Sequence, residues 1–331
     1  MHRVHIVLGA VLLLAGLTGG PALGQVRGVR IAFIGKSYAN PVFLAAHSGA
    51  LAAARELSQQ HGFAVQVEIL TPQREDAAAQ AAQIRRAGLI GFDAIAVAPS
   101  DAAQVGEAVA EVVAKGVAVM TFDADLPRSG RFAHFGIDDE ASGERLVEEL
   151  LPLIGGQGPI AVLAGNPEAP NLQARVAGVR RGAKRLGVEV VGVYSHEETA
   201  VAAVAEVIRV NREHPEVKGW ALVGGWPMFR SSASLAFLRD IREREQKLAA
   251  IDGLPDQLHY AEKGLAVLLA QPVYDWGTVA VSTIVDHVVL SKPVSEYVEM
   301  QLVRVTADNL GEWARTLASW GFTLPEEYLA R

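Results

Sequence analysis

The sequence predicts an α/β protein of two similar lobes, each built from a parallel sheet with helices on both faces. Short runs rich in β-branched residues alternate with longer stretches of helical spacing from Val29 onward, which is the pattern of strands joined by crossover helices. The same alternation begins again after Asp138. The chain has 331 residues, half of them hydrophobic, and this is enough for two domains with cores of their own.

The first half contains four apolar segments with the character of strands. The helical stretch that begins at Pro41 keeps apolar residues on one face as far as Leu57, and Gly62 is placed to end it. Strands that alternate with helices in this way pair in parallel. We expect strands at Val29–Gly35, Ala64–Leu70, Asp93–Pro99 and Val117–Asp123, and helices at Pro41–Gly62, Arg74–Ala87 and Ala102–Lys115.

The second half repeats this architecture. A strand-like link at Phe132–Asp138 and a helix at Glu140–Ile154 lead into it. We expect strands at Pro159–Gly165, Val188–Tyr194, Trp220–Gly224, Leu248–Asp252 and Leu265–Gln271, then helices around Trp276–Leu290 and at Asp308–Trp320. The repetition predicts two lobes of one fold, with the last helix packed on the second lobe.

No linker rich in Pro, Ser or Gly separates the two halves. We therefore expect short crossing strands to join the lobes, at Ala133–Asp138, Gln271 and Glu299–Val303. The corresponding domain boundaries are 29–137 plus 272–300 for the N-terminal lobe and 138–271 plus 301–331 for the C-terminal lobe.

Residues 1–24 have the pattern of a secretory signal peptide. Arg3 supplies a positive start, Val4–Leu17 is apolar, and Ala22-Leu23-Gly24 provides small residues for cleavage. The apolar stretch is shorter than the roughly 20 residues that span a bilayer. The chain has no cysteine, so a lipid anchor on an N-terminal cysteine is not expected. We expect a protein that is exported to the periplasm and is free of the membrane.

Composition and motifs argue against several functions. The chain has 30 Lys and Arg against 37 Asp and Glu, without a basic run, so we expect neither nucleic acid nor an anionic membrane surface as a partner. No nucleophile elbow, phosphate-binding loop or zinc-protease motif is present, and the nine histidines lack ligand spacing. We therefore expect no enzyme, no metal and no cofactor, and we interpret His196, Glu197 and Glu198 as a solvated loop.

Polar side chains or a tryptophan follow most of the predicted strands. Open α/β sheets bind ligands in the crevice beyond the carboxyl ends of their strands. The residues at these ends are Lys36, Ser100, Asp123, Asn166, Trp226, Asp252 and Gln271. Carboxylates and amides that converge with an aromatic ring suit a small hydroxylated ligand.

Several short motifs resemble a known family. They are Asn40-Pro41 with Phe43, Ala98-Pro99-Ser100-Asp101, Thr121-Phe122-Asp123, a helix opened by Arg175-Val-Ala-Gly178, and Ile251-Asp252-Gly253-Leu-Pro255-Asp256 followed by Gln271-Pro272. In this order they resemble the type I periplasmic sugar-binding proteins of the ribose/galactose-binding group, which are similar to the effector domain of LacI-type repressors. The resemblance runs from about Val29 to Val305 and implies the type I fold with hinge closure around a ligand.

The resemblance also implies a ligand site. It would place Lys36, Asn40, Phe43 and Asp123 on the first lobe, Asn171, Arg175 and Asp252 on the second, and Gln271 at the hinge. Asp123 is followed by Ala124 where ribose binders have arginine, and Glu197 or Glu198 falls where an aromatic residue is common. These departures argue against ribose itself and leave another sugar or a polyol as the expected ligand.

Each of these residues also has a structural interpretation. Trp226 follows two glycines that allow close approach of the backbone, so we expect it to stack on the ligand, whereas Trp276 is expected to pack within its helix. The alternatives are helix capping for Asn40 and Asn171, core packing for Phe43, a solvated strand end for Lys36, turn capping for Asp123 and Asp252, a surface ion pair for Arg175 and bonding of the crossing strands for Gln271.

The expected function is that of a monomeric solute-binding component of an ABC importer, which delivers its ligand to a membrane permease. The alternative is a co-receptor that reports the ligand to a membrane-bound kinase or chemoreceptor. An exported hydrolase is disfavoured because no nucleophile–base pair appears. A repressor is disfavoured because a signal peptide, and not a helix-turn-helix, precedes the first strand.

Overall fold

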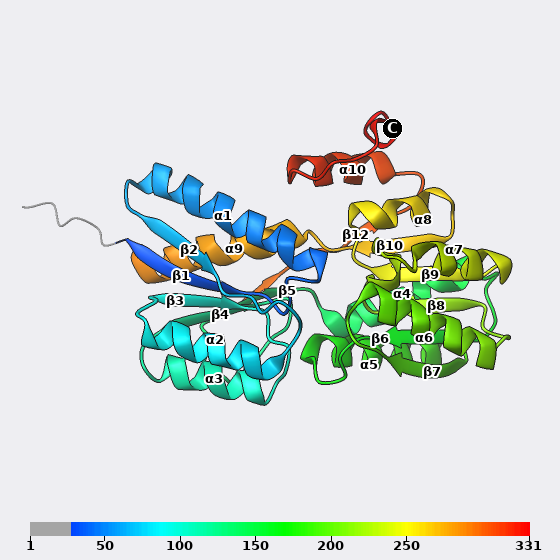
Figure 1. Cartoon of the computed structure of the whole chain (residues 1–331), viewed down its shortest axis with the longest axis horizontal. Coiled ribbons are helices and arrows are strands. Elements are labelled where there is room, and N and C mark those ends of the chain that lie inside the picture. The colour runs from blue at the N-terminus through cyan, green and yellow to red at the C-terminus, as the bar shows by residue number, and fades with distance from the viewer. Residues whose placement is uncertain (1–27) are drawn as a thin grey trace, which may run out of the picture.

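A computed structural model describes residues 28–331, so the predicted signal peptide at 1–24 lies outside the described residues. Two lobes lie side by side, and each has a central sheet between layers of helices (Figure 1). The predicted α/β class and the parallel sheets are confirmed. Within residues 28–331, no helix has both the length and the apolar character that crossing a bilayer requires.

The first sheet has the strand order β11-β5-β4-β3-β1-β2, and all its pairs are parallel. Its strands are β1 Val29–Ile34, β2 Val65–Ile69, β3 Ala94–Val97, β4 Ala118–Phe122, β5 Ala133–Gly136 and β11 Tyr297–Glu299. Helices α1 (Pro41–His61) and α9 (Val273–Ile284) pack together on one face, and α2 (Ala77–Leu89) and α3 (Gln104–Val113) on the other. Phe33 faces the first pair and Ile34 the second, so β1 is buried on both faces, as the apolar run Ile31–Ile34 indicates.

The second sheet has the order β12-β10-β9-β8-β6-β7, and in it only β12 runs antiparallel. Its strands are β6 Ile160–Ala164, β7 Val190–Ser195, β8 Gly219–Leu222, β9 Lys247–Ile251, β10 Ala266–Ala270 and β12 Val303–Val305. Its helices are α4 Asp139–Leu153, α5 Pro170–Leu186, α6 Ala200–Glu213, α7 Ser234–Glu243, α8 Leu258–Glu262, α10 Leu310–Ser319 and α11 Glu326–Leu329. The last long helix packs on this lobe, where the indole nitrogen of Trp313 donates to the carbonyl of Gly253 at 2.6 Å.

Single turns complete the chain, at Trp226–Met228 and Pro255–Gln257 with 3₁₀ geometry and at Val285–Val289 with π geometry.

Helix α5 is held very close to α4. A Cβ added at Gly178 would lie 1.9 Å from the carbonyl oxygen of Glu140, so only glycine allows this crossing. The close approach brings Arg175, one turn before Gly178, against Asp139 at the start of α4. The glycine therefore positions a buried charge at the cleft.

Two predicted helix starts are wrong. The helix predicted to open at Arg175 begins at Pro170, with proline at the first position and Ala169 as an N-cap without a side-chain hydrogen bond. Asn171 therefore lies inside α5 and does not cap it. The helix predicted from Arg74 begins at Ala77, because the side chain of Asp76 accepts from the backbone of Ala79 and fixes the start there.

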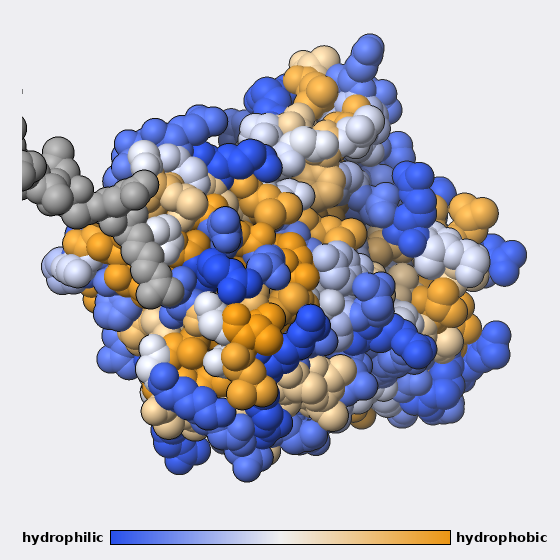
Figure 2. Space-filling model, turned by 60° about the vertical axis from the view of Figure 1, so that its left-hand side comes forward, coloured by the Kyte–Doolittle hydropathy of each residue, from blue (hydrophilic) through white to orange (hydrophobic). Residues whose placement is uncertain are grey.

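Large apolar side chains at the surface are scattered over both lobes. Figure 2 shows apolar areas between charged side chains on one face of the molecule. Those that are well exposed are Leu44, Leu51, Leu89, Ile90 and Tyr297 on the first lobe and Val201 and Leu235 on the second. Single apolar residues of this kind are normal on protein surfaces, and they do not mark a second site.

Candidate functional site

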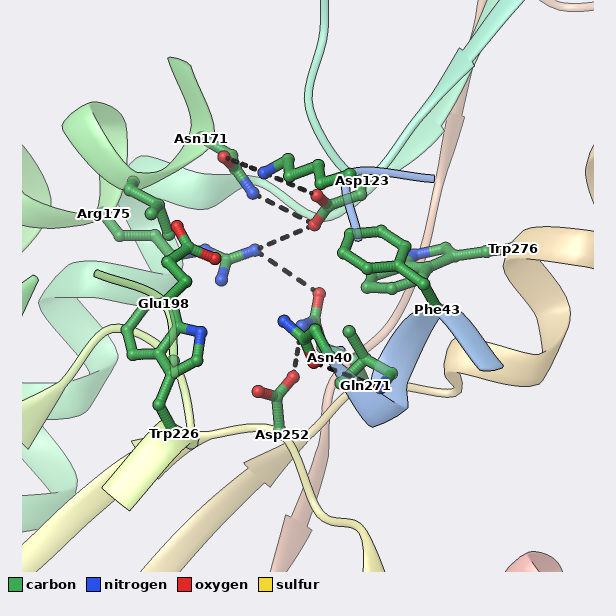
Figure 3. A pocket seen from close by; sticks show the side chains of 14 residues that line it. Asn40, Phe43, Asp123, Asn171, Arg175, Glu198, Trp226, Asp252, Gln271 and Trp276 are labelled. Carbon is green, nitrogen blue, oxygen red and sulfur yellow. Dashed lines mark hydrogen bonds and ion pairs between the residues drawn. The ribbon is translucent and has the colours of Figure 1, made fainter. Parts of the chain in front are cut away.

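A partly open cavity lies between the lobes, beyond the carboxyl ends of both sheets, and has a free volume of about 30 Å³. All nine residues that the sequence placed in the site line it, namely Lys36, Asn40, Phe43, Asp123, Asn171, Arg175, Trp226, Asp252 and Gln271. Figure 3 shows their side chains converging from both lobes. Glu198 and Trp276 also line the cavity, although they were interpreted as a solvated loop residue and a packing residue. Contact of these side chains with a ligand remains a prediction.

Lys36, Asp123 and Asn171 form a ring of polar contacts across the cleft. The Lys36 ammonium lies 2.9 Å from one Asp123 oxygen and donates to the amide oxygen of Asn171 at 3.0 Å. The Asn171 amide nitrogen donates to the other Asp123 oxygen at 3.0 Å. Burial lowers the pKa of Lys36, but the nearby carboxylates, led by Asp123, outweigh burial and raise it above its usual value. Lys36 is thus a buried cation, not a solvated strand end.

Arg175 is the second buried cation, with 3% of its side chain exposed. Its Nε donates to Asp139 at 2.8 Å and one terminal nitrogen donates to the carbonyl of Val223 at 2.9 Å. The other terminal nitrogen lies 3.5 Å from the amide oxygen of Gln271 and 3.7 Å from Asp123. Burial raises the pKa of Asp139 to about 6, although Arg175 opposes the shift. The alternative of a surface ion pair for Arg175 is therefore wrong.

The two strand-end aspartates share an unusual backbone conformation. Asp123 has a φ of 61° and Asp252 a φ of 80°, in the left-handed region that favours glycine but that Asp and Asn tolerate better than most residues. One oxygen of Asp252 accepts from the backbone nitrogen of Gly225 at 3.0 Å, and the other from the amide of Gln271 at 2.8 Å. Such strained residues cluster at ligand sites, and both carboxylates here point into the cavity (Figure 3).

Aromatic rings cover the polar cluster on two sides. Phe43 and Trp276 stack with ring centroids 5.7 Å apart on the first-lobe side, and Trp226 stands opposite them (Figure 3). Trp226 begins a 3₁₀ turn after two glycines, and a Cβ at Gly224 would meet its ring at 2.5 Å. Flat rings above and below polar groups suit the C–H faces of a sugar ring.

Asn40 and Asn171 have different local roles. Asn40 caps α1, because its side-chain oxygen accepts from the backbone of Val42 at 3.2 Å. Capping uses only this oxygen, and its amide nitrogen lies among the cleft side chains in Figure 3. The predicted coexistence of capping and a place in the cavity is thus observed for Asn40, whereas Asn171 serves the cleft alone.

Glu198 and Trp276 are site residues that sequence reasoning missed, although the resemblance had put Glu197 or Glu198 where an aromatic residue is common. The backbone nitrogen of Asn166 donates to the Glu198 carboxylate at 3.1 Å, while the Asn166 amide donates at 2.8 Å to Glu75 of the first lobe. Burial and the nearby Glu198 raise the pKa of Glu75 to about 8, against the opposing effect of Lys36. A carboxylate from each lobe thus meets at the cleft margin. The sequence signal was weak, since Glu198 follows β7 by three residues within a polar stretch.

Comparison with known proteins shows the family of this chain. The family model of the periplasmic binding protein domain matches residues 31–292. The chain belongs to this family.

Two relatives of this periplasmic binding protein are named for sugars or were solved with one. The D-ribose/D-allose-binding protein of Pseudomonas aeruginosa is 27% identical over 207 residues, which span 59% of this chain and 62% of that protein. An ABC transporter solute-binding protein from Burkholderia graminis, solved with D-arabinose, has a TM-score of 0.76 at 25% identity and covers 86% of this chain and 97% of its own.

A further structure shares the fold alone. It is a carbohydrate transporter solute-binding protein from Agrobacterium radiobacter, also with D-arabinose, which reaches a TM-score of 0.77 at 20% identity over 88% of this chain and 98% of its own. These comparisons confirm the predicted resemblance and the prediction of a binding protein rather than an enzyme. Among residues 28–331, no group of three or more His, Asp or Glu side chains is arranged to hold a metal ion.

Proposed function

We propose that this periplasmic binding protein captures a neutral monosaccharide, or a polyol of similar size, and delivers it to the membrane permease of an ABC importer. The observation that carries this proposal is the cluster of buried carboxylates, amides and cations between aromatic rings of opposite lobes. The sugars named for the Pseudomonas and Burkholderia relatives support this class of ligand.

The balance of charge in the cleft favours a neutral ligand. Lys36 and Arg175 are its buried cations, and both already face carboxylates. The carboxylates of Asp252 and Glu198 add negative charge to the lining. A sugar acid or sugar phosphate would meet like charge without a free cation, which costs several kcal/mol. Hydroxyl groups, by contrast, can donate to the carboxylates and accept from the amides.

We propose that the lobes open and close at the three predicted crossing segments, with the domain boundaries given above. Asn171 and Arg175 of the second lobe contact Asp123 of the first only while the cleft is closed. A ligand that bridges the lobes favours the closed form by its differential affinity for it. Export through a cleaved signal peptide and a monomeric state belong to the same proposal.

A thermal-shift screen tests the ligand class. A ligand that binds only the folded protein adds about 2.7 kcal/mol to the unfolding free energy at a hundredfold excess over Kd, which should raise Tm by about 4 °C for a protein of this size, at about 2.1 cal/mol/K of unfolding entropy per residue. We expect shifts with neutral pentoses, hexoses or polyols and none with the matched sugar acids and phosphates. If no neutral sugar or polyol raises Tm, the proposed ligand class is wrong.

Rising pH is expected to weaken ligand binding. The pKa of Glu75 in the closed cleft is raised from 4.5 to about 8 by burial and by the nearby Glu198, and opening removes both of these causes. The closed form therefore keeps a proton that the open form releases. This stabilisation of the closed form is complete below about pH 4.5 and is lost as the pH rises toward about 8. Titration calorimetry across this range should show Kd rising by up to about tenfold per pH unit.

The control for this effect is Glu75→Gln, which keeps the shape and the contact with Asn166 but removes the titrating proton. Its Kd should change much less with pH than that of the wild type. A wild-type Kd that is constant over the same range would contradict proton-linked closure.

A further inference from the structure

The indole nitrogen of Trp276 is a buried donor without an acceptor in the described part of the chain. The Trp276 side chain is 1% exposed, and an indole N–H can only donate. Three other buried side-chain atoms also lack a hydrogen-bond partner, on Gln83, His196 and Gln257. Of the four residues, Trp276 alone lines the cavity between the lobes. Folded proteins rarely leave such a group without a partner.

The Trp276 ring cannot turn away to find another acceptor. It packs between Phe43 and Phe122, with centroids 5.7 Å and 6.0 Å away. Its helix is fixed as well, because a Cβ at the next residue, Gly277, would lie 2.0 Å from the carbonyl oxygen of Ala46 on α1. Figure 3 shows the indole reaching from α9 to a position behind the Phe43 ring. The ring therefore has one fixed position beside the cavity that Trp276 lines.

We propose that the Trp276 indole N–H donates a hydrogen bond to one hydroxyl oxygen of the bound sugar and so determines which hydroxyl pattern the cleft accepts. This inference rests on the proposed function. The partner must be an acceptor, since the indole N–H has no acceptor capacity. A hydroxyl that accepts from Trp276 can donate its own proton to a carboxylate of the cleft, of which Asp123 and Asp252 are the strand-end members. A sugar that lacks this hydroxyl leaves the donor unpaired, which is how buried polar groups reject analogues.

The decisive variant is Trp276→Phe, which removes the N–H and keeps an aromatic ring against Phe43. Loss of one such bond should weaken binding about tenfold. The probes are D-arabinose, D-ribose and D-allose, each with its monodeoxy derivatives, measured by titration calorimetry. For the sugar that binds, removal of one particular hydroxyl should weaken binding to the wild type by more than tenfold, because the deoxy sugar loses both the bond from Trp276 and its own bond to a carboxylate. In the variant the same removal should weaken binding about tenfold less than in the wild type, because only the bond to the carboxylate is left to lose.

Trp220→Phe is the matched control. Trp220 is also fully buried, but its indole nitrogen donates to Asn211 at 3.1 Å within the second lobe. This variant should lose thermal stability and keep the affinity and the deoxy profile of the wild type. In nuclear magnetic resonance spectra, the indole proton that disappears in Trp276→Phe should be the one that shifts most when the wild type is titrated with sugar.

The outcomes separate the two proposals. If the wild type binds none of the probes, the proposed function fails for these sugars and the inference fails with it. If the wild type binds a sugar while Trp276→Phe keeps its affinity and deoxy profile, the proposed function stands and the role of Trp276 is wrong.

Discussion

Replacing Arg175 with methionine is expected to lower the free energy of unfolding by about 3–5 kcal/mol and to abolish measurable sugar binding. The side chain is 3% exposed and donates to Asp139, while its terminal nitrogens reach Val223 and Gln271. Methionine fills much of the volume of the arginine side chain but leaves the buried carboxylate of Asp139 without the cation that it pairs with. Urea denaturation measures the loss of stability, and titration calorimetry measures the loss of binding.

This loss should depend on pH in a defined direction. The pKa of Asp139 is already raised to about 6 by burial, and removal of Arg175 should raise it further. A carboxyl whose pKa is raised on folding stabilises the protein below the pKa of the unfolded chain, about 3.9, and this contribution is lost as the pH rises through the folded value. Arg175→Met should therefore come closest to wild-type stability in acid and fall furthest from it above about pH 6.

Two controls sharpen the test. The first control is Arg181→Met. Arg181 lies on the same helix, but its side chain is 52% exposed and pairs with Glu140 and Glu144 at the surface. Such pairs contribute about 0–1 kcal/mol, so the free energy of unfolding of this variant should be close to that of the wild type. Adding Asp139→Asn to Arg175→Met should recover stability without recovering binding. If Arg175→Met alone is as stable as the wild type, the buried pair of Arg175 and Asp139 does not support the fold.

The sheets of this protein could be predicted from the sequence because most of their strands are buried on both faces. Such strands appear as continuous apolar runs, and β1, β3 and β10 lie within two residues of their predicted bounds. Helix starts were harder. At α5 the start is set by Pro170 after a cap without a side-chain bond, and no periodic signal marks that position. The motif Arg175-Val-Ala-Gly178 therefore predicts a start five residues too late.

The candidate site was predictable where strand ends alone determine it. Lys36, Asp123 and Asp252 follow parallel strands, whose carboxyl ends meet at one edge of each sheet. The positions on helices, Phe43 and Arg175 among them, came from the family resemblance and not from spacing.

Trp276 shows what the sequence could not provide. An apolar residue at helical spacing has the same pattern whether its ring lies in the core or at the wall of a cavity. Only the packing of α9 against α1 decides between the two. Glu198 was missed for a related reason, because the Asn166 backbone holds it at the end of the second sheet, and the polar stretch around it gives no sign of that contact.

Replacing Asp252 with alanine is expected to weaken sugar binding by about 10² to 10⁴-fold, which corresponds to two lost hydrogen bonds to a charged acceptor at about 1.5–3 kcal/mol each. The carboxylate accepts from Gly225 and Gln271 and still has lone pairs for ligand hydroxyls. Closure should fail together with binding, because only the ligand's differential affinity favours the closed lobes. Titration calorimetry gives the affinity, and small-angle scattering with and without sugar gives the compaction.

Two further variants are needed, because alanine is strained at the φ of 80° that residue 252 adopts, and this strain would lower stability in addition to the loss of the carboxylate. Asp252→Asn tolerates this φ and can still accept from Gly225, but its amide nitrogen then faces the Gln271 amide nitrogen, so it loses this hydrogen bond as well as the charge. It should fold and bind sugar more weakly than the wild type. Asp252→Gly relieves the backbone and removes every side-chain contact. It should therefore unfold at higher urea than Asp252→Ala and bind as poorly. If alanine or glycine at this position binds sugar like the wild type, or if the wild type does not compact with a sugar that it binds, then Asp252 does not couple the ligand to closure.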